Sequence, residues 1–280
     1  MPTLRPTVTP RTKLAKGVPA KLTFRMSMQP PLGTFVFRNL ANVVSILGVL
    51  PLCLLFQEDG FRYLIPLIVY NNIMDDLDGV LAGKLDIRSQ FGAQLDNVCD
   101  SISHTVFVLV VGMYYFQAAD CLVLGGACLA GSLLVAVAMI VRTVARLDPS
   151  AVSSRGSPTN EAIRHVFFVL LLTEPTLGFS PTRALLMEPT LGFNPTPVLL
   201  IAVFVLHSVS MLVPFRLPYL IRSLTKSATT IGLVNVALVV AWLVPYTAPV
   251  VAAAFVGAYL WSFAAGGIRW RRETDTLDPP

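Results

Sequence analysis

The sequence predicts an all-α integral membrane protein: a bundle of about eight transmembrane helices (six to eight) with both termini in the cytoplasm. Composition is the first reason, because 54% of the 280 residues are hydrophobic and only 13% are charged, whereas a soluble domain is about one-quarter charged. The mean hydropathy of +0.68 agrees with this class. The other reasons are the division of the chain into apolar segments and the placement of its basic residues.

Apolar segments follow one another along the chain, and most approach the roughly 20 residues that a helix needs to cross a bilayer. We expect residues 1–30, which are polar and rich in proline and basic residues, to form a disordered basic cytoplasmic tail. The transmembrane domain then covers 31–268, and 269–280 form a second cytoplasmic tail. The apolar segments are 36–56, 62–83, 92–116, 121–141, 161–173, 197–215, 228–245 and 247–266.

Basic residues support this topology. If the amino terminus is cytoplasmic, every lysine and arginine except Arg62 and Arg183 falls on the inner side of the bundle, as the positive-inside rule expects. This distribution also accounts for the pI of about 9.2 without nucleic acid as a partner. The expected surroundings are membrane lipid.

A tandem repeat stands between the fifth and sixth segments. LLTEPTLGFSPTRA (171–184) is followed directly by LLMEPTLGFNPTPV (185–198). Two copies are too few for a solenoid, and each contains two prolines and a glycine, which interrupt helices. We interpret the repeat as a local duplication in an outer loop.

Four aspartates lie within membrane-length apolar sequence: Asp75, Asp78, Asp96 and Asp100. A carboxylate at the centre of a bilayer helix costs about 2.5–3.5 kcal/mol on insertion scales. The unfavourable insertion energy of these four carboxylates must therefore be offset by interactions with partners. The first two aspartates are three residues apart and the last two are four apart, so on helices each pair projects from one face.

A short cytoplasmic loop joins the second and third segments, so the two pairs of carboxylates should meet at the same depth near the inner interface. Hard divalent cations prefer such all-oxygen ligand sets, and two cations held there could clamp a diphosphate. The small residues Gly79, Ala82 and Gly92 on these faces would let a base or a diphosphate approach the backbone closely.

The stretch Asp75-x2-Asp78-Gly79-x2-Ala82-Gly83-x8-Gly92-x3-Asp96-x3-Asp100 resembles the signature of the CDP-alcohol phosphotransferase family, D-x2-D-G-x2-A-R-x8-G-x3-D-x3-D. One position departs from it: Gly83 stands where the family has arginine, and Lys84 follows at once. The segment FRNLANVVSILG (37–48) also resembles the family's first-helix element, with Asn39 in its asparagine position. Eight helices are typical of the members that make phosphatidylserine or bacterial phosphatidylcholine.

This resemblance implies an enzyme that transfers the phosphatidyl group of CDP-diacylglycerol to a small alcohol and releases CMP, with serine as the first choice of acceptor and choline as the second. It implies two divalent cations (Mg²⁺ or Mn²⁺), a homodimer, and a site on the cytoplasmic face of a bacterial inner membrane. The expected metal ligands are Asp75, Asp78, Asp96 and Asp100, with Asp100 as a ligand or as the general base. The expected contacts of the CDP moiety are Gly79, Ala82, Gly92, Asn39 and Lys84, and those of a phosphate or the acceptor are Arg88 and Arg216.

Two other functions stay open on the sequence. The intramembrane carboxylates could form the pathway of a cation transporter or channel. Alternatively, because Gly83 replaces the arginine of the motif, the chain could be a family member that binds nucleotide or lipid without turnover.

Overall fold

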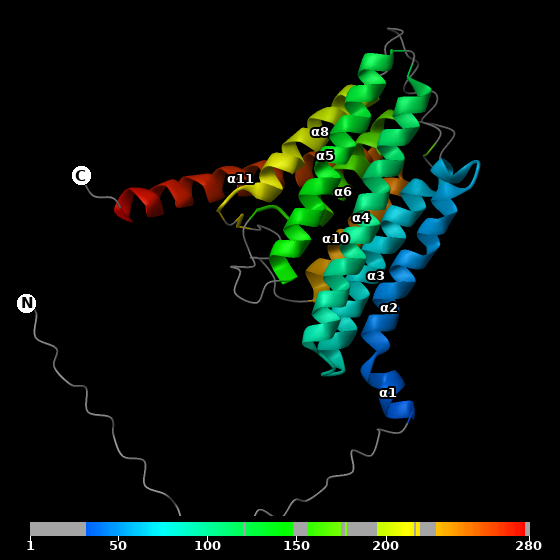
Figure 1. Cartoon of the computed structure of the whole chain (residues 1–280), viewed down its shortest axis with the longest axis vertical. Helices are drawn as coiled ribbons and strands as arrows, with labels where there is room; N and C mark the ends of the chain where they lie inside the picture. The colour runs from blue at the N-terminus through cyan, green and yellow to red at the C-terminus, as the bar shows by residue number, and fades with distance from the viewer. Residues whose placement is uncertain are drawn as a thin grey trace, which may run out of the picture.

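The computed structural model describes residues 32–119, 121–147, 156–174, 177, 195–215, 217–218 and 228–277, and within these ranges every regular element is helical. The predicted all-α class is therefore confirmed. Each predicted apolar segment coincides with at least one helix (Figure 1). The elements are α1 (Leu32–Arg38), α2 (Leu40–Val49), η1 (Leu50–Phe56), η2 (Gly60–Tyr63), α3 (Leu64–Lys84), α4 (Gln90–Ala118), α5 (Leu122–Leu147), α6 (Thr159–Thr173), α8 (Thr196–Leu212), α10 (Ala228–Leu243), η4 (Pro245–Thr247) and α11 (Ala248–Leu277).

The first predicted segment is not one continuous helix. α1 ends at Arg38, and Asn39, with φ −103° and ψ 9°, separates it from α2. At Leu50 the chain passes into the 3-10 helix η1, one residue before Pro51. Proline has no backbone N–H and its ring crowds the carbonyl four residues back, so the α-helical hydrogen bonds cannot continue through this point.

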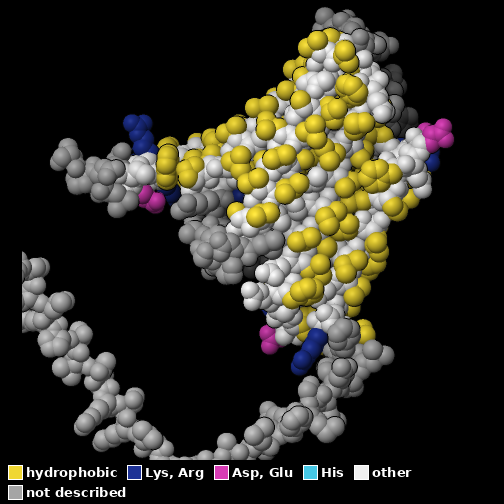
Figure 2. Space-filling model, in the orientation of Figure 1, with side chains coloured by type: hydrophobic (Ala, Val, Ile, Leu, Met, Phe, Trp, Pro, Cys, Tyr) yellow, Lys and Arg dark blue, Asp and Glu magenta, His cyan; other side chains and the backbone are white. Residues whose placement is uncertain are grey.

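Three of the described helices, α4, α5 and α11, are long and apolar enough to cross a membrane. α3 has 21 residues, but Asp75, Asp76 and Asp78 interrupt its apolar character. Apolar side chains cover the visible face of the bundle, and charged side chains lie toward its ends (Figure 2). Contiguous apolar surface of this kind suits lipid and not water, which agrees with an integral membrane protein. The number of spans and their orientation stay predictions.

α4 lies at the centre of the bundle and packs against α2, α5 and α6. Its side chains Phe107, Val108 and Val111 are 0% exposed and belong to one core with side chains of α3, α5, α6 and α8. Gly112 allows α5 to come close, because a Cβ there would overlap Oγ of Ser132 and lie 2.6 Å from its Cβ. This packing fixes the helix that carries Asp96 and Asp100.

Residues 85–89 turn the chain from α3 into α4, and each helix end is capped. At the end of α3 the N–H of Ile87 donates to the carbonyl of Ala82 (3.1 Å), and Asp86 takes a left-handed φ of 54°. This is the hydrogen bond of a Schellman cap, in which aspartate tolerates the position that usually holds glycine. At the start of α4 the Ser89 hydroxyl accepts a hydrogen bond from the N–H of Gly92 (2.9 Å), as an N-cap does. The caps define a tight hairpin.

The last two helices pack outside this hairpin. α10 contacts α3, and α11 contacts α6. α11 projects away from the bundle toward the carboxyl terminus (Figure 1), and it continues to Leu277, through most of the range that we expected to be a tail. The predicted amino-terminal tail and most of the tandem repeat (178–194) lie outside the described residues.

Candidate metal centre

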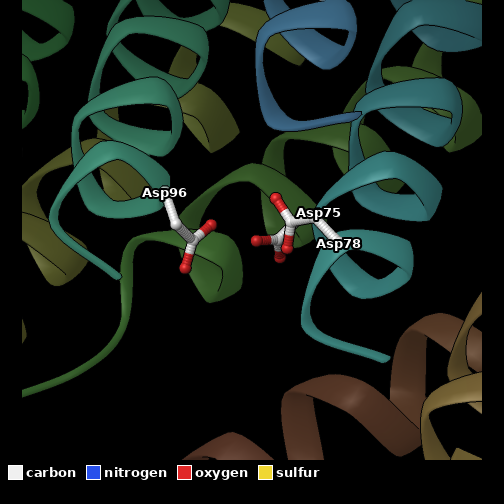
Figure 3. Close-up of side chains that lie close together, drawn as sticks. All are labelled: Asp75, Asp78 and Asp96. Carbon is white, nitrogen blue, oxygen red and sulfur yellow. The ribbon is translucent and has the colours of Figure 1, made fainter. Parts of the chain in front are cut away.

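Three of the four predicted carboxylates meet between α3 and α4. Asp75 and Asp78 come from the carboxyl-terminal half of α3 and Asp96 from the second turn of α4, and all three point toward one another (Figure 3). One carboxylate oxygen from each lies within 4.8 Å of the others. Asp78 is 5% exposed, and the other two are partly buried.

Neighbouring helices hold two of these carboxylates. The Ser45 hydroxyl of α2 donates a hydrogen bond to Oδ2 of Asp78. Nδ2 of Asn160, in the first turn of α6, donates to Oδ2 of Asp75 at 2.8 Å. The start of α6 is itself fixed to α4, because Nδ1 of His104 lies 2.8 Å from the hydroxyl of Thr159.

Asp96 completes the group and carries its unsatisfied atom. Its Oδ1 is buried and has no hydrogen-bond partner among the described residues, and the two ion pairs resolved between described side chains lie elsewhere, at Arg62–Asp59 and Arg164–Glu161. Like charges this close repel one another unless a cation or a proton intervenes. Carboxylate oxygens are the ligands that Mg²⁺, Mn²⁺ and Ca²⁺ prefer, so these residues fit a divalent cation.

Asp100 lines the same cavity without joining the trio. The cavity has a volume of about 10 Å³, close to the space that one water molecule needs by this measure. It therefore has room for an ion and not for a nucleotide, so a substrate would have to lie over its mouth. Its lining residues are Ser45, Gly48, Asn71, Asp75, Asp78, Asp96, Cys99 and Asp100.

The small residues of the motif differ in what surrounds them. Gly79 is exposed and nothing lies within 4 Å of the place where its Cβ would be, whereas Ala82 is partly buried. Beside Gly92 that space is filled by Oδ1 of Asn42 at 2.9 Å. Asn42 in turn donates a hydrogen bond to Oδ1 of Asn39 (2.9 Å). Gly92 thus lets α2 approach α4 closely. Asn42 lies between the two, beside Gly92 and hydrogen-bonded to Asn39.

The cations near the motif are also placed. A Cβ on Gly83 would lie 2.9 Å from a terminal guanidinium nitrogen of Arg88, so Arg88 folds back over the position at which the family has arginine. Lys84 is exposed at the end of α3. Arg216, the other predicted phosphate or acceptor contact, lies outside the described residues.

Residues that the sequence analysis missed are mostly polar side chains inside apolar helices. Ser45 and Asn160 hold the carboxylates directly, and Asn71, 5% exposed, donates to the Ser103 hydroxyl (3.0 Å) beside the cavity. The adjacent amides Asn71 and Asn72, one turn before Asp75, are a sequence signal for such contacts. Unpaired amides are unfavourable in a membrane helix, so these two side chains need polar partners on neighbouring helices.

A family comparison agrees with this geometry. The model of the CDP-alcohol phosphatidyltransferase family matches residues 38–205, more than half of the chain. The chain belongs to this family. No curated protein matches the sequence significantly.

The match covers α2 to α6 and most of α8, so it includes the whole carboxylate cluster and leaves α10 and α11 outside. Members of the family are transferases that act on phospholipid headgroups in membranes and use a divalent metal. Their substrates are a CDP-alcohol and an acceptor alcohol. The suspected family is therefore confirmed, and the three clustered aspartates are side chains that could bind that metal.

Proposed function

We propose that the protein transfers the phosphatidyl group of CDP-diacylglycerol to a small alcohol and releases CMP, with serine as the preferred acceptor and choline as the second choice. The observation that carries this proposal is the convergence of Asp75, Asp78 and Asp96 within 4.8 Å, with a buried oxygen of Asp96 left unsatisfied. Such a group, lying within the family match, suits the metal-assisted cleavage of a charged diphosphate.

In this proposal Asp75, Asp78 and Asp96 hold Mg²⁺ or Mn²⁺, which would neutralise charge on the diphosphate and on the departing CMP. The acceptor hydroxyl oxygen forms a bond to the phosphorus that carries the diacylglycerol, and the bond from this phosphorus to the oxygen of CMP breaks. Asp100, which lines the same cavity, takes the proton of the hydroxyl as the general base.

The CDP moiety would lie over the open side of α3. Gly79 is exposed there, and Gly83 lies one turn further along the same face, with the guanidinium of Arg88 above it. A planar cation that can donate two parallel hydrogen bonds suits a phosphate. This face would be cytoplasmic in a bacterial inner membrane, because Lys84 and Arg88 flank the α3–α4 turn and basic loops stay inside.

The test is a panel of acceptors. Purified protein in lipid nanodiscs receives CDP-diacylglycerol, Mg²⁺ or Mn²⁺, and labelled serine, choline, inositol or glycerol phosphate in turn, and the lipid product is identified by mass. We expect one acceptor, serine first, to give a product lipid and an equal amount of CMP.

Absence of any product lipid with all four acceptors, from folded protein that binds Mn²⁺, would contradict this reaction and favour a member without turnover. Cation flux into vesicles that contain the protein, without CMP release, would favour a channel or transporter instead.

A further inference from the structure

Asn235 of α10 forms a second polar contact with the helix that carries the proposed ligands. Its Nδ2 donates to Oδ2 of Asp76 at 2.5 Å, and its Oδ1 accepts a hydrogen bond from Nδ2 of Asn72 at 2.6 Å. Asn72 is 8% exposed, and its side-chain oxygen Oδ1 accepts a hydrogen bond from the guanidinium of Arg164 in α6 (3.1 Å). Both ends of the Asn235 amide are therefore used, and both partners lie on α3.

Asn235 is unusual for its surroundings. From Gly232 to Leu243, Asn235 and the indole N–H of Trp242 are the only polar side-chain groups; all the remaining side chains are apolar. An amide in such a helix is unfavourable unless neighbouring helices satisfy it, and interhelical hydrogen bonds add little stability on average. α10 also lies outside the range that matches the family. A stabilising role alone is therefore a weak reason for an amide at this position.

The contact has a direct consequence for the carboxylate cluster. Asp76 adjoins Asp75 in α3, and neighbouring helical residues point about 100° apart, so Asp75 faces Asn160 while Asp76 faces α10. Ser45 of α2 also donates to Asp78. Side chains from three helices, α2, α6 and α10, therefore form hydrogen bonds with α3 within residues 75–78. A rotation of α3 by about 10° would move a carboxylate by roughly 1 Å, enough to spoil a cation site.

We propose that Asn235 is a positioning residue. By holding Asp76 it sets the rotation of α3 and so places Asp75 and Asp78 at the distance from Asp96 at which the three bind a divalent cation. Helix α10, outside the family match, then contributes to the metal centre. This inference rests on the proposed cation site and not on the identity of the acceptor.

The test measures cation binding without turnover. The full-length protein in nanodiscs, without lipid substrate, is titrated with Mn²⁺, and free Mn²⁺ is followed by electron paramagnetic resonance. For Asn235→Leu we expect the dissociation constant for Mn²⁺ to rise about tenfold, as on loss of a partner that orients metal ligands, with little change in the thermal midpoint measured in EDTA. Asn235→Gln, which retains an amide, should recover part of the affinity.

A matched control separates positioning from packing. Leu238, one turn further along α10, is 1% exposed and forms none of these hydrogen bonds, so Leu238→Ala should lower the thermal midpoint through a cavity and leave the dissociation constant unchanged. In an Asp76→Ala background, which removes the acceptor of the Asn235 amide, Asn235→Leu should cost less further affinity than it does in the wild type, because the two residues share that contact.

Different results point to different errors. Wild-type affinity in Asn235→Leu, or an equal loss of affinity in Leu238→Ala, would overturn the positioning role. Wild-type affinity in Asp75→Asn would show instead that the cation site itself is wrong. Wild-type protein that binds no Mn²⁺ would overturn both proposals.

Discussion

Moving the arginine from position 88 to position 83 tests how this chain supplies the cation that its motif lacks. The motif of the family has arginine where the chain has Gly83, and the guanidinium of Arg88 lies 2.9 Å from the place of a Cβ at this position. Three variants are compared with the wild type: Arg88→Ala, Gly83→Arg and the double variant. If Arg88 binds the diphosphate from there, either single change should impair substrate use and the double change should restore it.

The magnitude follows from the geometry. A hydrogen bond to a charged group contributes about 1.5–3 kcal/mol; because Arg88 is exposed, the lower value applies, and kcat/KM for Arg88→Ala should fall about tenfold. Gly83→Arg alone must displace the guanidinium of Arg88. Two such cations about 4 Å apart repel by roughly 1 kcal/mol in water, which corresponds to about a fivefold loss. The double variant should return to within about threefold of wild type.

The assay is the initial rate of CMP release against the concentration of CDP-diacylglycerol in mixed micelles. The loss should appear mainly as a higher KM, since the contact is formed in the bound substrate as well as in the transition state. Lys84→Ala is the matched control, because Lys84 follows Gly83 directly and is the cation that the sequence predicts to contact the CDP moiety. A larger loss in Lys84→Ala than in Arg88→Ala, or a double variant worse than either single one, would show that Arg88 does not bind the diphosphate from this position.

Two further predictions concern stability and orientation. Gly112→Ala should lower the thermal midpoint in detergent, since its new Cβ meets Ser132 and overpacking costs about 1–3 kcal/mol. Gly126→Ala is the control: nothing lies within 4 Å of its new Cβ, so its thermal midpoint should equal that of the wild type. A Gly112→Ala protein with the same midpoint as Gly126→Ala would contradict the close α4–α5 contact. In a cysteine-free background, an impermeant thiol reagent added outside cells should modify a cysteine at Ser180 and not one at Ser89. Labelling in the opposite sense would reverse the proposed orientation.

Much of the metal centre could be predicted from the sequence, because it depends on local spacing. Carboxylates three and four residues apart share a helix face, and the short connection between α3 and α4 leaves few ways to arrange two such faces. These facts predict that all four aspartates meet; the structure brings Asp75, Asp78 and Asp96 together, and Asp100 lines the same cavity.

The residues that hold the cluster could not be predicted in the same way. Ser45 is 33 positions from Asp78, Asn160 is 85 from Asp75 and Asn235 is 159 from Asp76. Which of the many polar side chains meet depends on how the helices pack, and a single sequence does not encode this in any local pattern. Similarly, the break at Asn39 and the return of Arg88 over Gly83 depend on backbone conformations in short connections.

In the proposed mechanism, the carboxylates between α3 and α4 bind a divalent cation that the transfer requires. The most direct measurement is CMP release from CDP-diacylglycerol, with the acceptor from the panel, in titrations of Mn²⁺. Wild-type protein and Asp86→Asn, which changes an exposed carboxylate of the turn, should show the same Mn²⁺ dependence. Asp96→Asn should lose about a hundredfold or more in activity at limiting Mn²⁺, with partial recovery at high Mn²⁺. Wild-type rates and Mn²⁺ dependence in Asp96→Asn would contradict the account.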